Sequence, residues 1–299
     1  PHSIYRWSSG IYEAEPGAFV DFTSAAGFDW WKAGIRSSLL DIGIDAVWND
    51  NNEFDSFDDT ARCAGFGKAV PLGMSRPLQT LLMGRASYEA ITEARPGLRP
   101  YVLTRAGCPG IQRYAQTWSG DNSTSWHTLR YNIPMGLGLS LSIFPPRFTI
   151  HSIGGENEVS EPWMYPEMLP LVRAAMLFRY SLLPYLYTLV FNAAQRGTPI
   201  IRPLVYSYQH DLRCQTESFT FLLGPNLLVA SVLEPGMRIQ RVYLPSDEMW
   251  CDFHNGHWHT GGQEIEVAAP LERTPLFVPA GGMIPTGKPM RYVGEQDDN

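Results

Sequence analysis

The chain has 299 residues, of which 44% are hydrophobic and 18% are charged, as is typical of a globular protein. This length allows one large domain, or one large and one small domain, each with its own core. The formal net charge of −7 argues against a nucleic-acid or anionic-membrane partner, because either would favour a basic face. No apolar run reaches the roughly 18 residues of a membrane span. The sequence therefore predicts a soluble protein that acts on a neutral molecule.

Strand-like and helical patterns alternate through the first two-thirds of the chain. Strands are predicted at residues 17–22, 43–48, 100–104, 113–118 and 147–151, and helices at residues 30–40, 78–95 and 124–133. A long helical stretch at residues 165–194 follows, broken near Pro170 and Pro184. Alternation of this kind indicates parallel βαβ units.

The pattern changes after Gly197. Short strand-like runs are then separated by Pro and Gly turns: FTFLLG, LLVASV, RIQRVYLP, EIEVAAP and PLFVPAGGMIP. This arrangement predicts an antiparallel sandwich. We place the domain boundary near residue 200, which gives one domain at residues 1–200 and a second at residues 201–299.

The cysteines lie far apart, without a CxxC pair: Cys63, Cys108, Cys214 and Cys251. This pattern favours free thiols in a reducing compartment over disulfides, and hence a cytoplasmic protein. The chain begins at Pro1 with neither an initiator Met nor a signal peptide, which we expect of a part of a larger protein.

Four polar residues directly follow predicted strands, where a parallel barrel carries its catalytic groups: Asp50, Arg105, Asp121 and His151. Each also has a structural explanation. Asp50 could belong to an Asn-rich turn or a helix N-terminus, and Asp121 could cap the helix that starts near Ser123. The Arg and the His could be satisfied polar groups of loops. Taken singly, these residues leave both interpretations open.

Taken together, the four residues match the needs of a retaining glycosidase. In such an enzyme one carboxylate attacks the anomeric carbon and a second protonates the leaving oxygen, with about 5 to 5.5 Å between them. Asp50 and Asp121, on different strands, are the candidates for these roles. The Arg and the His could hold sugar hydroxyls, and Trp48 and Trp118 could supply apolar contact with the sugar ring.

Two segments resemble the signatures of glycoside hydrolase family 31, which includes α-glucosidases and α-xylosidases. WNDNNE resembles the family's W-x-D-x-N-E motif, and RPYVLTRAGCPGIQRYAQTWSGDNSTSW is similar to its second signature, an Arg on one strand followed by W-x-G-D-N. Downstream, PRFTIHS and EPWMYPE resemble the last barrel strand and the loop after it. The resemblance runs through nearly the whole chain. It implies an α/β fold, a (β/α)8 TIM barrel followed by an antiparallel β-sandwich domain.

Carried over position by position, the resemblance assigns the catalytic roles. It implies that Asp50 is the nucleophile and Asp121 the general acid/base. Arg105, Trp118 and His151 match residues that line the subsite for the cleaved sugar, and Trp48 lies beside them. The resemblance implies neither a metal ion nor a cofactor.

The implied activity is that of a retaining α-glycosidase, which hydrolyses a neutral α-linked sugar, foremost an α-glucoside, through a covalent glycosyl-enzyme. An α-transglycosylase or an α-xylosidase would use the same residues. An alternative from another class is a catalytically inactive carbohydrate-binding or structural remnant. The expected partner is a carbohydrate, with neither nucleic acid nor membrane, and a homo-oligomer is compatible with the sequence.

Part of the barrel has no counterpart in this chain. A (β/α)8 barrel takes about 250 residues, whereas only about 200 precede the predicted sandwich. In the family, a segment like GLGLSLS leads into a further strand and helix before the segment like IFPPRFTIHS, but here Ser142 is followed at once by Ile143. About one βα unit is therefore missing between residues 142 and 143. Either the polypeptide contains residues that this sequence omits, or it lacks them, and we favour the first explanation.

Two other motifs are interpreted structurally. His254, His257 and His259 resemble a metal-ligand cluster, but Asn255-Gly256 between strand-like runs predicts a hairpin turn instead. Asn122-Ser-Thr fits the glycosylation pattern, yet a glycan there would block the proposed acid/base.

Overall fold

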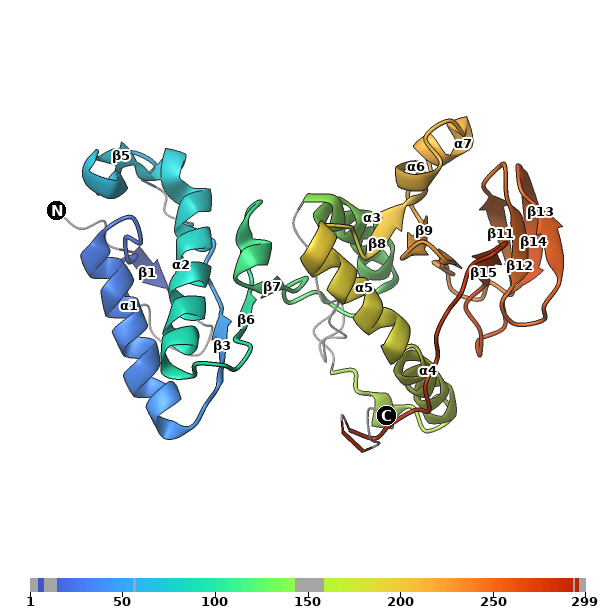
Figure 1. The fold of residues 1–299 in the computed structure, drawn as a ribbon, viewed down its shortest axis with the longest axis horizontal. Coiled ribbons are helices and arrows are strands. Elements are labelled where there is room, and N and C mark those ends of the chain that lie inside the picture. Colours follow the sequence, from blue (N-terminus) through green and yellow to red (C-terminus); the bar gives the residue numbers. More distant parts are fainter. Residues whose placement is uncertain (1–4, 8–14, 56–57, 143–158, 293, 296–299) are drawn as a thin grey trace. The chain divides into compact units, whose positions relative to one another are not determined.

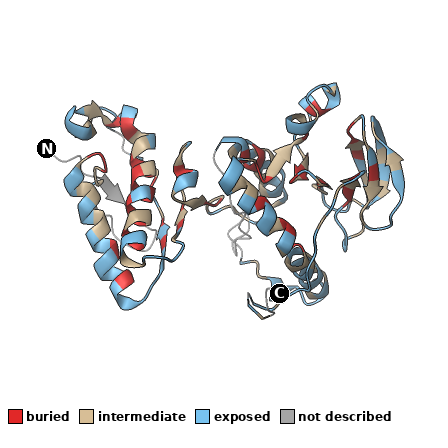
Figure 2. Ribbon diagram, viewed as in Figure 1, coloured by how far each residue is buried: buried red, intermediate tan, exposed pale blue. Residues whose placement is uncertain are grey.

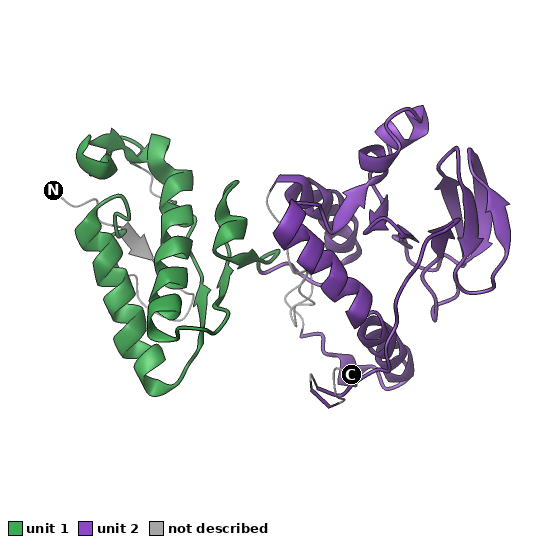
Figure 3. Cartoon of the chain, viewed as in Figure 1, with its two compact units in different colours: residues 1–120 green, residues 121–299 purple. Residues whose placement is uncertain are grey.

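The computed structural model describes residues 5–7, 15–55, 58–142, 159–292 and 294–295. The chain divides into two compact units, residues 1–120 and residues 121–299 (Figure 3). Each unit has buried hydrophobic clusters of its own. This division differs from the predicted domain boundary near residue 200, which remains a prediction.

The first unit contains the βα alternation (Figure 1). Its strands are β1 (Tyr5–Trp7), β2 (Glu15–Gly17), β3 (Ala46–Asn49), β4 (Arg62–Cys63), β5 (Val70–Pro71), β6 (Tyr101–Thr104) and β7 (Gln116–Thr117). Its helices are α1 (Ala25–Ser38), α2 (Leu72–Ala94) and the 3-10 turns η1 (Leu40–Ile42), η2 (Gly65–Gly67) and η3 (Ile111–Arg113). Strands β3, β6 and β7 form a parallel sheet in that order, as the alternation predicted.

Among the described residues, this parallel sheet packs one face against helices and exposes side chains on the other, which we call the bare face; Figure 2 colours each residue by its burial. On the covered face, Val47 of β3 and Val102 of β6 pack with Ile35 and Ile91 of the helical layer. On the opposite face, Trp48 is 62% exposed and Tyr101 is 39% exposed. Parallel sheets are normally covered on both faces, so a three-stranded sheet with one bare face is what an incomplete barrel would present.

One predicted strand of the first unit is wrong. Residues 18–22 form no strand, because β2 ends at Gly17 and the chain then turns. The Asp21 carboxylate accepts hydrogen bonds from the backbone N–H groups of Thr23 and Ala64, at 2.9 and 2.6 Å. The Gln79 amide oxygen accepts from Phe22 N–H at 2.7 Å. Side-chain partners thus satisfy the backbone that a sheet ladder would otherwise satisfy.

The remaining predictions in this unit are right in kind but differ in their limits. Helix α2 begins six residues before the predicted start and carries Pro77 inside it. The strand predicted at residues 113–118 is reduced to β7, because residues 111–113 form η3 around the fully buried Ile111. Strand β3 begins later than expected, after Gly43 closes η1 in a left-handed conformation that favours glycine.

The second unit combines helices with a sheet domain. Its helical elements are α3 (Trp126–Ser142), η4 (Pro162–Met164), α4 (Leu169–Ser181), α5 (Leu183–Arg196), α6 (Leu204–Ser207) and α7 (Leu212–Gln215). Helices α4 and α5 meet at Leu182, so the long helical stretch breaks near Pro184 as predicted. Helix α3 runs nine residues beyond the predicted end. The strand predicted at residues 147–151 lies outside the described residues.

The sheet domain is antiparallel. Its strands are β8 (Ile201–Pro203), β9 (Thr220–Leu223), β10 (Leu227–Ala230), β11 (Ile239–Leu244), β12 (Met249–Asp252), β13 (Trp258–Thr260), β14 (Gln263–Ala268) and β15 (Leu276–Pro279). Six of them form one sheet in the order β13-β12-β15-β10-β9-β8, and β11 pairs with β14. Val242 and Leu244 of β11 are fully buried in one cluster with Trp250 and Phe277 of the larger sheet. This packing of two sheets confirms the predicted sandwich.

The histidine motif lies in a hairpin, as predicted. Strands β12 and β13 pair with each other, and Gly256 adopts a φ of 75° in the turn between them. Nε2 of His254 lies 2.8 Å from the carbonyl oxygen of Thr274, and the ring of His259 contacts Phe277. The described ranges contain no group of three or more His, Cys, Asp or Glu residues that could hold a metal ion.

Two further findings concern the cysteines and the helices. All four cysteines are free, as their spacing predicted. Among the described residues no single helix is long and apolar enough to cross a membrane. Only α4 and α5 taken together reach that length and hydropathy, and they are bent by 52° at their junction.

Candidate active site

Asp50 lies at the C-terminal end of β3, where its strand gives way to a loop. The alternation of β3 buries Val47 and Asn49 against the helical layer and leaves Trp48 on the bare face. Asp50 follows the last strand residue and its side chain is 36% exposed. In the described part of the chain the residues after it form a loop rather than a helix, so Asp50 does not cap a helix N-terminus.

The loop after β3 is held in a costly backbone conformation. Asn51 and Phe54 adopt left-handed φ angles of 50° and 57°. Asn tolerates this region, whereas an aromatic residue rarely does. The Phe54 side chain is 4% exposed, and its ring lies 5.3 Å from Phe19 and 6.0 Å from Phe22. Burial of the Phe54 ring therefore anchors the loop that carries Asp50, and strain of this type often accompanies functional sites.

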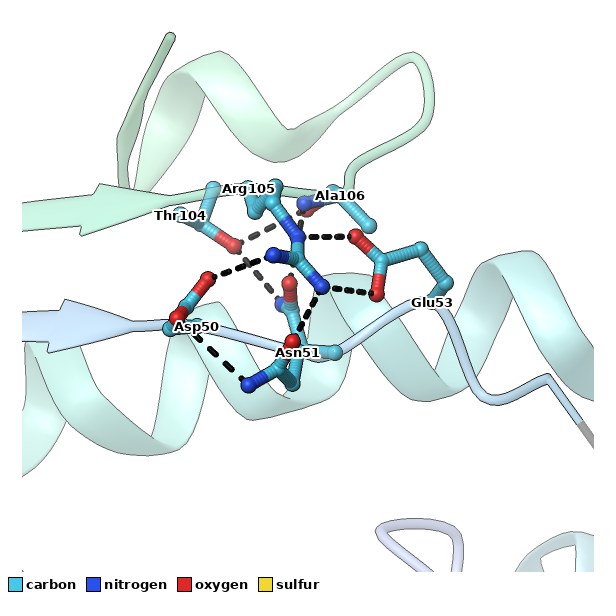
Figure 4. A network of polar contacts seen from close by, with 7 residues as sticks. Asp50, Asn51, Glu53, Thr104, Arg105 and Ala106 are labelled. Atoms are coloured by element: carbon cyan, nitrogen blue, oxygen red, sulfur yellow. Dashed lines mark hydrogen bonds and ion pairs between the residues drawn. The ribbon is translucent and has the colours of Figure 1, made fainter. Parts of the chain in front are cut away.

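Arg105 follows β6, the parallel neighbour of β3, and reaches the loop after β3 (Figure 4). Its Nη1 atom lies 3.1 Å from Oδ1 of Asp50. Its Nε and Nη2 atoms donate hydrogen bonds to the two carboxylate oxygens of Glu53, at 2.5 and 3.0 Å, and Nη2 also donates to Oδ1 of Asn51. One guanidinium thus contacts two carboxylates and one amide from a single loop. Asp50 and Arg105, both singled out in the sequence, therefore lie in contact in the structure.

The contact between Asp50 and Arg105 is one-sided. Oδ1 of Asp50 is buried, and its approach to Nη1 is an ion pair that lacks hydrogen-bond geometry, so this oxygen accepts no hydrogen bond within the described ranges. Because Oδ1 is covered while the side chain as a whole is 36% exposed, the accessible oxygen is Oδ2. Its contact from Nδ2 of Asn51 is long, at 3.5 Å.

Glu53 is held in its charged form. Burial acts to raise its pKa, but the hydrogen bonds and the charge of Arg105 outweigh burial and bring the pKa of Glu53 below its usual value. Glu53 therefore acts as a fixed negative charge beside Arg105.

Trp48 and Trp118 meet at the same end of the sheet. Trp118 directly follows β7 and is 7% exposed, whereas Trp48 is 62% exposed. Their ring centroids lie 5.5 Å apart in an edge-to-face arrangement. Asp50, Arg105, Trp48 and Trp118 thus lie at the C-terminal ends of three adjacent parallel strands, which is where a barrel carries its active site.

Asp121 opens the second unit and has an exposed side chain. It does not cap the helix that follows, because α3 begins at Trp126 and Ser125 supplies the cap, with its Oγ accepting a hydrogen bond from Thr128 N–H at 3.1 Å. The neighbouring Asn122 donates to Oδ1 of Asn132 at 2.9 Å. The helix-cap explanation of Asp121 is therefore wrong. Its catalytic pairing with Asp50 remains a prediction.

His151, the fourth polar residue predicted for the site, lies outside the described residues. Its placement in a sugar subsite likewise remains a prediction.

Sequence reasoning missed a buried link beneath the site. Asn52 is 2% exposed; its Nδ2 donates to Oγ1 of Thr104 at 2.8 Å, and its Oδ1 accepts from the N–H of Ala106 at 2.9 Å. Thr104 in turn donates to the carbonyl of Ala106 at 2.9 Å. These bonds connect the loop of Asp50 to the end of the strand before Arg105. The only sequence signal was the run of asparagines around Asp50, which also fits an ordinary turn.

Known proteins match both parts of the chain. The profile described as "Glycosyl hydrolases family 31 TIM-barrel domain" matches residues 3–145 and 139–189. The profile of the "Glycosyl hydrolase family 31 C-terminal domain" matches residues 197–284. The predicted architecture, a TIM-barrel portion followed by a sheet domain, is confirmed.

Similar sequences are found in bacteria and plants. "Alpha-glucosidase 2" of Bacillus thermoamyloliquefaciens is 31% identical over 325 residues, covering 96% of this chain and 41% of that protein. "Probable glucan 1,3-alpha-glucosidase" of Arabidopsis thaliana is 36% identical over 335 residues, covering 95% of this chain and 35% of that protein. The chain thus spans well under half the length of these relatives.

A solved structure agrees with these matches. A family 31 dextranase of Flavobacterium johnsoniae, complexed with isomaltotriose, superposes with a TM-score of 0.83 at 27% identity, covering 98% of this chain and 41% of that one. With both domain profiles matched over most of its length, the chain belongs to glycosyl hydrolase family 31.

Proposed function

We propose that the protein containing this chain is a retaining α-glycosidase that hydrolyses a neutral α-linked sugar, namely an α-glucoside. The observation that carries the proposal is the position of Asp50. Its carboxylate stands at the C-terminal end of a parallel strand, with one oxygen covered by Arg105 and the other accessible. In a family 31 chain, this is the position of an attacking carboxylate.

The proposed mechanism is a double displacement. Oδ2 of Asp50 attacks the anomeric carbon while Asp121 donates its proton to the leaving glycosidic oxygen, which breaks the glycosidic bond and forms a covalent glycosyl-enzyme. Asp121, now ionised, takes a proton from a water molecule. That water attacks the same carbon and releases Asp50. Two inversions give net retention of the α configuration.

The other site residues either support Asp50 and Trp48 or contact the sugar. Arg105 stabilises the ionised Asp50 by its charge, and Trp48 presents an exposed aromatic face at the strand ends. Trp118, buried behind it, holds the Trp48 ring in place. We assign His151 to the same subsite as a hydroxyl-binding residue. This set of residues needs neither a metal nor a cofactor for the proposed chemistry.

The names of relatives support an α-glucoside as substrate. The two curated proteins described above are named α-glucosidases. Structural neighbours at 27% identity include a dextranase and an α-xylosidase from Xanthomonas citri. Xylosides are therefore the main alternative substrates. Transfer to a second sugar instead of water is the main alternative outcome of the second step.

The experiment is a screen of aryl α-glycosides with the full-length protein and its Asp50→Ala variant. We expect hydrolysis of the α-glucoside by the wild type, no turnover by Asp50→Ala, and covalent labelling of Asp50 by a 5-fluoro-α-glucosyl fluoride. Labelling of another residue, or full activity in the variant, would disprove the assignment. Sugar binding without hydrolysis would identify an inactive remnant. Oligosaccharide products at high sugar concentration would identify a transglycosylase.

The location of the protein is part of the proposal. Four free cysteines support a reducing, cytoplasmic environment. Fractionation of source cells with an antibody against this chain tests it.

A further inference from the structure

The site contains two carboxylates that compete for one guanidinium. Arg105 can chelate a carboxylate through Nε with Nη2, or through Nη1 with Nη2. Glu53 occupies the first of these pairs, at 2.5 and 3.0 Å, and Asn51 adds a second acceptor to Nη2. Only Nη1 is directed to Asp50 (Figure 4). Nη1 thus contacts one oxygen of Asp50, whereas a chelated carboxylate receives two contacts from a guanidinium.

We propose that Glu53 is a positioning residue that acts through Arg105: by accepting hydrogen bonds from Nε and Nη2, it fixes the orientation of the guanidinium, so that Nη1 faces one oxygen of Asp50 and Oδ2 stays open for attack. This inference rests on the proposed glycosidase function. Glu53 itself neither touches the reacting atoms nor transfers a proton.

The two carboxylate oxygens of Asp50 differ in exposure, which agrees with a positioning role for Glu53. Oδ1, which faces Nη1, is buried, and the accessible surface of the side chain belongs to the Oδ2 side. If Glu53 lost its charge, the guanidinium would lose the carboxylate that fixes its orientation and could turn toward Asp50. A guanidinium that chelates both oxygens of Asp50 would cover Oδ2 and withdraw charge from it. The attack on the anomeric carbon would slow.

The loop geometry explains why Glu53 is the residue that orients the Arg105 guanidinium. Asp50 and Glu53 stand on one short loop, and the left-handed Asn51 between them turns its own amide oxygen onto the same guanidinium. Phe54 fixes the far end of the loop by burial. Asp50, Asn51 and Glu53 thus approach Arg105 from one side, each facing a defined nitrogen.

The variant that tests the proposal is Glu53→Gln in the full-length protein. Gln offers one acceptor and an N–H₂ group that repels Nη2, so chelation by residue 53 is lost. We expect the rate of Asp50 labelling by the 5-fluoro-α-glucosyl fluoride, and kcat/KM for an aryl α-glucoside, to fall roughly 10- to 100-fold. Glu53→Asp keeps the charge next to Arg105, so its loss should be smaller. Crystals of Glu53→Gln should show Arg105 bridging both oxygens of Asp50.

A double-mutant cycle separates positioning from general damage. In an Arg105→Ala background, Glu53→Gln should cause no further loss, because Glu53 acts only through Arg105. A matched control is Glu89→Gln: Glu89 accepts from Nε of Arg85 at 2.7 Å and is 29% exposed, compared with 34% for Glu53, but lies on α2. This control should keep wild-type kinetics and a melting temperature close to that of Glu53→Gln.

Three results would overturn the inference. They are an unaffected Glu53→Gln, an equal loss in the Arg105→Ala background, and a larger loss in Glu53→Asp than in Glu53→Gln. In each case an active wild type would leave the proposed function standing. A wild type that neither hydrolyses α-glycosides nor labels at Asp50 would overturn the proposed function, and this inference with it.

Discussion

Asn52 and Thr104 join the two strand ends of the site through a buried hydrogen bond, with Nδ2 of Asn52 2.8 Å from Oγ1 of Thr104. The same Asn side chain accepts from the N–H of Ala106, so one residue satisfies a buried hydroxyl and a partly buried backbone group. The loop of Asp50 and the residues around Arg105 are therefore fixed to each other beneath the ion pair. Their relative position does not depend on the exposed charges alone.

Replacing Asn52 by Ala should lower stability and activity together. The change removes a partner from the buried hydroxyl of Thr104 and from the partly buried N–H of Ala106, and a loss of this kind costs about 1–3 kcal/mol. We expect a lower melting temperature in thermal unfolding and slower labelling of Asp50.

The control for this prediction is Asn255→Ala. Asn255 also uses both ends of its amide, with Asp252 and with the N–H of His257, but it is exposed in the hairpin turn. This variant should keep wild-type labelling. An Asn52→Ala protein with unchanged kinetics would show that the buried link does not position the site.

Substitution of Trp48 should mainly affect substrate binding, and substitution of Trp118 should mainly affect protein stability. Trp48→Ala removes an exposed ring, so we expect KM to rise roughly 3- to 10-fold with little change in melting temperature. Trp118→Ala removes a ring that is 7% exposed and should cost about 3–5 kcal/mol of stability. Steady-state kinetics and thermal melts of both variants provide the test. Equal stability losses would contradict the structural roles given to the two rings.

Asp211 should contribute to stability in a pH-dependent manner. Burial acts to raise its pKa, but hydrogen bonds from Ser246 and Tyr243 outweigh burial and lower the pKa of Asp211 from 3.8 to about 2. Because the folded-state pKa is depressed, the stabilisation is present above about pH 4 and is lost as the pH falls toward 2.

The matching variant is Asp211→Asn. Asn can still cap α7, where Asp211 now accepts from the N–H of Arg213, but it carries no charge for Tyr243 and Ser246. Denaturant titrations should show a less stable variant at pH 6 and a smaller difference from wild type near pH 3. A difference that grows on acidification would contradict the assignment.

The missing βα unit can be tested by peptide mapping. Trypsin cleaves after Arg130 and Arg147, so a polypeptide in which Ser142 is bonded to Ile143 would yield a peptide of residues 131–147. We expect this peptide to be absent from digests of the purified protein, and peptides in which Ser142 is followed by other residues to replace it. Detection of the 131–147 peptide would show that the unit is truly lacking.

Two observations support this expectation. The barrel-domain profile matches in two pieces that overlap at residues 139–145, and the comparison with the Bacillus relative extends over 325 residues although this chain has 299.

The sequence by itself determined the class of the protein and the nature of its elements. Hydrophobic periodicity was sufficient to identify β3, α2 and β6, since each buries one face against its immediate neighbours. The motif WNDNNE was sufficient to propose Asp50 as a site residue, and the Asn-Gly pair correctly predicted the hairpin between β12 and β13. These features are local, so a single stretch of chain contains the information for each.

Only the tertiary structure decided how the site is held together. The strand predicted at residues 17–22 failed because Gln79, 57 residues away from Phe22, supplies the hydrogen bond that a ladder would supply. The division of Arg105 between Asp50 and Glu53, and the link from Asn52 to Thr104, likewise join residues more than 50 positions apart. Such contacts depend on the packing of β3 against β6 and on the left-handed loop between Asp50 and Phe54. The packing of the two strands and the loop conformation produce no periodic pattern in the sequence. Both depend on contacts between segments that are far apart along the chain.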